Sequence, residues 1–412
     1  MSAITEGFVR EQPTREKLYS NIALEQRMFN AGISIDRRVL RELDYGNYLE
    51  QVHNLFNMNH NVHTATKLPD SFRDATGYSF GVCYDPHSRF AITGEDGRYY
   101  LHEGKQYLFE VFFQRKPKWY DLETSDGIEL SRIAQYVGGE KISITYSNEC
   151  SLQDKGLDCL FCNINATKAA FADLEGLGIK TPRQIGETVK AAYDEGFLRF
   201  TVTGGFIPER REVDYYIDVA EAVQEATGLA NFRGAACIGA PIDLDVIDKY
   251  KEAGYECIAT NMEVWDLNYF KTICPGKDLI CGGRDNWVRA LLHEVEVFGR
   301  GHVRSTFVAG IEPKSKTLEG LQFLAEAGVV CIPNQWNPNP GSELEGHRAP
   351  NADWYHDLLM KNYALMRKNG LTHEDYFRSS NGGDTIYDYL FNADGDLLPW
   401  ERDLYPELRK AA

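Results

Sequence analysis

A regular alternation of helical and apolar segments begins near residue 196 and constrains the fold of the chain most strongly. Helical stretches end in glycine, and a short apolar run follows at once, as in EGFLRFTVT, TGLANFRGAAC, AGYECIATN, FGRGHVRSTFVAG and AGVVCIP. Glycine accepts the left-handed conformation that ends a helix, and the apolar run that follows is typical of a buried strand. With the strand predicted at 141–147, the pattern gives six strand–helix units. Such units predict a parallel sheet with helices outside, either open or curled into a barrel.

The two ends of the chain do not follow this alternation. We expect residues 1–140 to form a separate α+β region of unknown role, helical over 14–58 and with short strands joined by turns over 77–114. Residues 141–345 carry the repeated units, and 346–412 are expected to be a helical segment that closes one end of the barrel.

Bulk composition excludes several classes of protein. The 412 residues carry a formal charge of -17, which disfavours a nucleic-acid partner because phosphate binding relies on clustered Lys and Arg. No apolar run approaches the length of a membrane span, and the N-terminus MSAITEGFVREQPTREK lacks the apolar core of a secretory signal. The nine cysteines, an odd number, fit a reducing cytoplasm. A cytoplasmic protein without membrane or nucleic-acid partners is expected.

Three cysteines lie in one segment directly after the predicted strand at 141–147. Cys150, Cys159 and Cys162 form a C-x8-C-x2-C loop. In a chain without an export signal, clustered thiolates are metal ligands more often than disulfide partners. A closed zinc site needs a fourth ligand, and no Cys or His at normal spacing supplies one nearby. Three thiolates on a 4Fe-4S cluster would leave one iron open. A non-catalytic zinc or iron–sulfur protein remains the alternative.

The loop resembles that of radical S-adenosylmethionine (SAM) enzymes, in the branch of biotin synthase and the hydrogenase maturases. Phe161, immediately before the last cysteine, carries the likeness, although eight residues separate Cys150 from Cys159 where three are usual. The resemblance implies a partial (β/α)6 TIM-type barrel. It also implies a 4Fe-4S cluster on the three cysteines, SAM on the open iron and the Phe161 ring near the adenine.

Further SAM contacts are implied at the ends of later strands. Thr203, Gly204 and Gly205 stand where the family holds the SAM ammonium group, with an ordinary tight turn as the alternative. Asn261 and Glu263 are two residues apart, so on an extended chain both face the same way, toward the ribose diol or toward solvent.

The fifth repeated strand supplies the remaining candidates. Arg304 matches a carboxylate in bidentate geometry and could pair with that of SAM, or it could support the barrel rim through Glu312. Gly310 and Ile311 resemble the family's apolar wall against adenine.

An auxiliary cluster is disfavoured. Cys237 alone falls at a position that matches biotin synthase, and Cys274 and Cys281 are remote candidates. The expected function is therefore a radical SAM enzyme that abstracts hydrogen from a small-molecule or cofactor-precursor substrate, with flavodoxin or ferredoxin as electron donor. The sequence specifies neither the substrate nor whether SAM is consumed.

Overall fold

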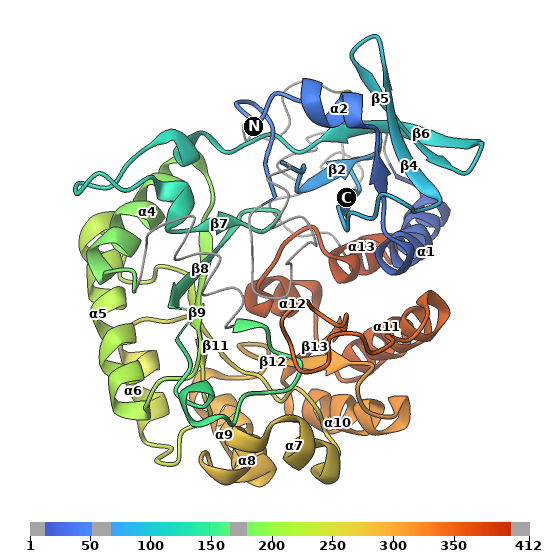
Figure 1. The fold of residues 1–412 in the computed structure, drawn as a ribbon. Coiled ribbons are helices and arrows are strands. Elements are labelled where there is room, and N and C mark those ends of the chain that lie inside the picture. Colours follow the sequence, from blue (N-terminus) through green and yellow to red (C-terminus); the bar gives the residue numbers. More distant parts are fainter. Residues whose placement is uncertain (1–12, 52–66, 148, 165–178, 397–412) are drawn as a thin grey trace.

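The computed structural model describes residues 13–51, 67–147, 149–164 and 179–396. Its larger sheet has seven strands in the order β13-β12-β11-β10-β9-β8-β7. The strands of this sheet are β7 (Gln135–Tyr136), β8 (Lys141–Ser147), β9 (Arg199–Gly204), β10 (Gly234–Ile238), β11 (Cys257–Thr260), β12 (Val303–Ala309) and β13 (Val330–Gln335). Strands β8 to β13 are parallel, and β7 pairs antiparallel with β8. Figure 1 shows this sheet curled, with helices along its outer side.

The helices between these strands are α4 (Pro182–Glu195), α5 (Glu209–Thr227), α6 (Val246–Glu252), α7 (Leu267–Ile273), α8 (Pro275–Leu279), α9 (Gly283–Phe298) and α10 (Lys314–Ala327). Helices α4, α5, α6, α9 and α10 end one or two residues before a glycine of the predicted pattern, whereas no such glycine marks the ends of α7 and α8. Helix α4 begins in a capping box, in which Thr181 and Gln184 satisfy each other's backbone N–H groups. It ends at Gly196 in the left-handed region, with φ 102°. The predicted partial (β/α)6 barrel is confirmed.

The N-terminal part forms a second sheet, in the order β1-β4-β5-β6-β2-β3. Its strands are β1 (Ser34–Ile35), β2 (Ser71–Arg73), β3 (Ser79–Gly81), β4 (Phe90–Glu95), β5 (Arg98–Glu103) and β6 (Gln106–Phe113), accompanied by α1 (Arg15–Ala31) and α2 (Arg37–Glu42). The α+β character is as predicted, but continuous helix over 14–58 is wrong. Gly32 (φ 73°) ends α1, and the chain enters β1; residues 52–58 lie outside the described ranges.

Three C-terminal helices connect the two sheets. They are α11 (Ala352–Lys368), α12 (His373–Ser379) and α13 (Ile386–Ala393). Helices α11 and α13 share a hydrophobic core with α1 and the N-terminal strands. The end of α12 meets the amino ends of β8 and β12, where Lys141 and Arg304 donate to its last carbonyls. The domain boundaries at 140 and 345 stay a prediction. Within the described ranges, no helix has both the length and the apolarity to cross a membrane.

Candidate active site

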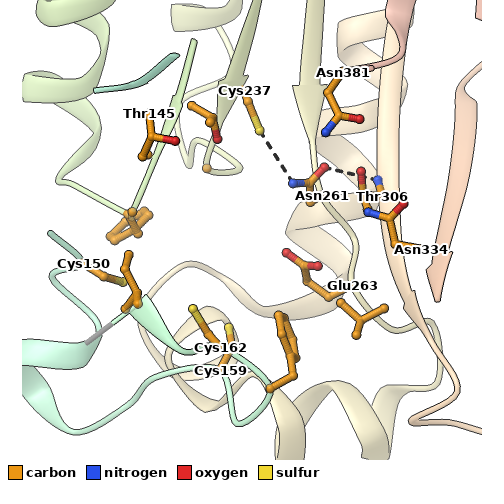
Figure 2. A pocket seen from close by; sticks show the side chains of 18 of the residues that line it. Thr145, Cys150, Cys159, Cys162, Cys237, Asn261, Glu263, Thr306, Asn334 and Asn381 are labelled. Atoms are coloured by element: carbon orange, nitrogen blue, oxygen red, sulfur yellow. Dashed lines mark hydrogen bonds between the residues drawn. The ribbon is translucent and has the colours of Figure 1, made fainter. Parts of the chain in front are cut away.

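A cavity of about 400 Å³ occupies the inside of the curled sheet. Alternate residues of the strands line it: Ser143 and Thr145 on β8, Thr201 and Thr203 on β9, and Arg304, Thr306 and Val308 on β12. This is the two-residue period of a strand, with every second side chain directed inward. Figure 2 shows Cys159 and Cys162 toward one end of the cavity and Cys237 and Asn381 toward the other.

The cysteine loop follows β8 and is held by backbone hydrogen bonds to distant segments. Leu160 N–H donates to the carbonyl of Ile273 (2.9 Å), and Gly276 N–H donates to that of Leu157 (3.0 Å). Cys162 N–H donates to Cys159 C=O (2.9 Å), which closes a tight turn around the buried Phe161. The short helices α7 and α8 thus anchor the end of the loop that carries the CxxC pair.

All three cysteines of the loop are free thiols and line the cavity. Burial raises the pKa of Cys162, and the neighbouring Cys159 and Cys150 add to this effect. A hydrogen bond from the buried Cys274 thiol lowers the pKa of Cys159. Among the described residues, no three His, Cys, Asp or Glu side chains are arranged as a ready metal site. Thiols have the chemistry of iron–sulfur ligands, and the role of these three as cluster ligands stays a prediction.

The glycines at the end of β9 are required by close packing of the chain. A Cβ on Gly205 would lie 2.0 Å from the carbonyl oxygen of Glu149, and one on Gly204 would lie 2.6 Å from the ring of Tyr146. Gly205 N–H donates to Ser147 C=O (3.1 Å), so this turn fixes the start of the cysteine loop. Both glycines and Thr203 line the cavity, and their contact with SAM stays a prediction.

Asn261 and Glu263 lie just beyond β11, and both line the cavity, as their spacing predicts. The Asn261 carboxamide accepts from Thr306 N–H (3.2 Å) and donates to the Cys237 sulfur (3.6 Å), as Figure 2 shows. Glu263 has a left-handed backbone (φ 66°) and pairs with Lys277 (2.8 Å). A non-glycine residue in this conformation is strained, which is common at binding sites.

Arg304 is buried at the second position of β12, near the end of the cavity away from the cysteine loop. Its Nη1 donates to the Ser379 carbonyl (3.0 Å), and its Nε has no hydrogen-bond partner in the described structure. Support through Glu312 is wrong, because Glu312 accepts instead from the backbone N–H groups of Trp265 and Asp266. Pairing of Arg304 with the SAM carboxylate stays a prediction.

Gly310 and Ile311 do not line this cavity. Ile311 packs against the small cluster around Phe161, whereas a Cβ on Gly310 (φ 116°) would lie 2.5 Å from the hydroxyl of Tyr355. The packing of Ile311 is compatible with an apolar wall, but contact of either residue with adenine stays a prediction.

No family model matches the chain. It is similar to the bacteriochlorophyllide c C-7(1)-hydroxylase of Chlorobaculum limnaeum, with 28% identity over 293 residues that cover 66% of this chain and 71% of that protein. This similarity supports the radical SAM superfamily that the cysteine loop resembles. It also supports an enzymatic activity, whose reaction subclass it does not define.

The chain also has a weaker likeness to several solved structures. Methylornithine synthase is 19% identical with a TM-score of 0.42, covering 61% of this chain and 72% of that one. The [FeFe]-hydrogenase maturase HydG is 16% identical with a TM-score of 0.43, covering 60% and 52%. Coproporphyrinogen III oxidase from Escherichia coli, a radical SAM enzyme, is 13% identical with a TM-score of 0.37, covering 58% and 55%.

Sequence reasoning missed several residues that line the cavity. They are Thr145, Glu212, Lys277, Asn334 and Asn381. Thr145 could have been found from the period of its strand. The others come from helices, a loop or strand ends. No local sequence pattern indicates how far these segments lie from the cysteines in the fold.

Of the remote candidates for an auxiliary cluster, Cys237 lines the cavity, whereas Cys274 and Cys281 are buried outside its lining.

Proposed function

We propose that this enzyme holds a 4Fe-4S cluster on Cys150, Cys159 and Cys162 and binds SAM at the cluster. The observation that carries the proposal is that three free thiols share one cavity with inward-facing hydroxyl, carboxamide and charged side chains of the barrel. When bound and reduced, the cluster and SAM supply a 5′-deoxyadenosyl radical, which abstracts hydrogen from the substrate. The protein positions both reactants and excludes water from them.

The residues around the cysteine loop are assigned to SAM. The inward-facing Thr203 and the close backbone at Gly204 and Gly205 suit the ammonium group of SAM. Asn261 and Glu263 suit its ribose hydroxyls. Asn261 is already oriented by Thr306 N–H, and Glu263 by Lys277, so binding would require little reordering of either side chain.

The substrate is proposed to be a small molecule that lies between SAM and the inner end of the cavity. A narrower candidate reaction is hydroxylation, which the 28% identity to a bacteriochlorophyllide hydroxylase favours. Incubation of the reduced enzyme with bacteriochlorophyllide c and SAM, followed by mass spectrometry, tests this candidate. Gain of an oxygen atom supports it, and unchanged pigment removes it.

An external one-electron donor of the flavodoxin or ferredoxin type is proposed as the protein partner, because the cluster must be reduced for each cleavage. The cytoplasm is the proposed compartment, since all nine cysteines are free thiols.

Anaerobic reconstitution with iron and sulfide tests the proposal against the zinc alternative. The radical SAM function predicts a brown protein whose spectrum changes when SAM is added and which forms 5′-deoxyadenosine after reduction. A colourless protein with one zinc ion per chain would support the alternative instead.

A further inference from the structure

The guanidinium of Arg304 is a buried positive charge with unused hydrogen-bond capacity. The side chain is 2% exposed, and among the described residues it makes one hydrogen bond, to the Ser379 carbonyl at the end of α12. Its Nε has no acceptor, and no residue that the structure describes forms an ion pair with it. A buried charge without a counter-ion is costly, so a ligand that supplies the missing negative charge would bind strongly there.

The other charges of the cavity already have partners within the protein. Glu263 pairs with Lys277, and Glu212 accepts from the N–H of Gly239. Lys141, the other cation that meets the end of α12, donates to the carbonyl of Phe377 and to the carbonyl and hydroxyl of Ser380. Arg304 differs from these neighbours because its Nε has no hydrogen-bond acceptor in the described ranges.

Neutral polar groups lie near the inner end of the cavity. Figure 2 shows Asn381 and Thr306 on the side of the cavity opposite Thr145. Thr306 is two residues from Arg304 on β12, and Asn381 follows Ser379, whose carbonyl accepts from Arg304. A carboxamide and a hydroxyl beside one guanidinium form a surface that hydrogen-bonds a carboxylate and the polar atoms next to it.

We propose that the inner end of the cavity recognises the carboxylate of the substrate, with Arg304 as its counter-ion. The inference rests on the proposed function and adds the substrate class, a small carboxylic acid that enters acid end first. The cysteine loop follows the carboxyl end of β8, whereas Arg304 lies near the amino end of β12. Arg304 precedes the last residue of β12 by five positions, which is about 16 Å along a strand. Because SAM is proposed to bind at the cysteine loop, this separation favours pairing of Arg304 with the carboxylate of the substrate over pairing with that of SAM.

Titration of the reconstituted full-length protein with acetate, followed through the acetate methyl NMR signal, tests the inference. Acetamide is the neutral probe of the same shape. Acetate should bind the wild-type protein and acetamide should not. Arg304→Gln should weaken acetate binding by about tenfold to a hundredfold, the range for one charge-assisted contact. Arg304→Lys keeps the charge and should retain acetate binding within about tenfold.

Arg300→Gln is the matched control, because Arg300 also donates to backbone carbonyls but lies exposed on the outside. Its acetate binding should equal that of the wild type. Absence of acetate binding to the wild type, or equal binding by Arg304→Gln, overturns the inference. If Arg304→Gln loses affinity for SAM and acetate competes with SAM for the wild-type protein, Arg304 pairs with the carboxylate of SAM. That result also overturns the inference. Failure of the proposed function appears separately, as a wild-type protein that does not cleave SAM.

Discussion

The carboxylate of Glu263 lies 2.8 Å from the ammonium group of Lys277, on the wall of the cavity that also holds the cysteine thiols. Lys277 also donates to the backbone carbonyl of Asn261 (3.1 Å). Burial acts to lower the pKa of Lys277, but Glu263 and the nearby thiols outweigh burial and raise it overall. The pair therefore fixes two candidate SAM contacts, Asn261 and Glu263, to the helix that anchors the cysteine loop.

Lys277→Met should destabilise the protein by about 3 kcal/mol, because it leaves the Glu263 carboxylate buried without its partner. Lys361→Met is the control, since Lys361 forms an exposed ion pair with Asp357 whose loss should cost less than about 1 kcal/mol. Urea unfolding measures both. Equal losses for the two variants would mean that the Glu263–Lys277 pair contributes no more than a surface pair.

Gly205→Ala should destabilise the turn before the cysteine loop by about 1–3 kcal/mol, because the added methyl group would lie 2.0 Å from the Glu149 carbonyl oxygen. Gly81→Ala is the control, since nothing lies within 4 Å of a Cβ built there. Thermal unfolding of the two variants tests the packing requirement, and a Gly205→Ala protein as stable as Gly81→Ala would contradict it.

Glu294 makes a pH-dependent contribution to stability. Its carboxyl is fully buried and hydrogen-bonded to Thr260, and burial raises its pKa from 4.5 to about 8. Between these values the folded state binds more protons than the unfolded state, so this group makes stability fall as pH rises. Glu294→Gln should remove this dependence of stability on pH. Between pH 4.5 and about 8, the stability of the variant relative to the wild type should therefore increase by about 1 kcal/mol per pH unit. Denaturant unfolding from pH 5 to pH 8 measures the difference, and parallel profiles for the two proteins would contradict it.

The barrel was predictable because its signals are local. Gly196, Gly228 and Gly328 each close a helix in the left-handed region directly before a strand, and an apolar run identifies the strand. The helix predicted over 14–58 failed because Gly32 and the two-residue strand β1 interrupt it. Such a short strand is stabilised by pairing with β4, far along the chain, and has no periodicity of its own.

The candidate site was predictable only where residues adjoin the strand ends. Asn261 and Glu263 line the cavity as their two-residue spacing suggests, and each of the three loop cysteines also lines it. Asn381 could not be found in this way, because it reaches the barrel from the segment after α12. The partner of Arg304 was likewise a carbonyl of the C-terminal part and not the nearby Glu312.

The central claim is tested most directly by the iron content and SAM cleavage of cysteine variants after anaerobic reconstitution. Cys150→Ala, Cys159→Ala and Cys162→Ala should each lose the cluster and form no 5′-deoxyadenosine. Cys83→Ala, whose thiol lies in the N-terminal part after β3, should match the wild type in both measurements. Full iron content and SAM cleavage in any one of the three loop variants would contradict the assignment of these thiols as the cluster ligands.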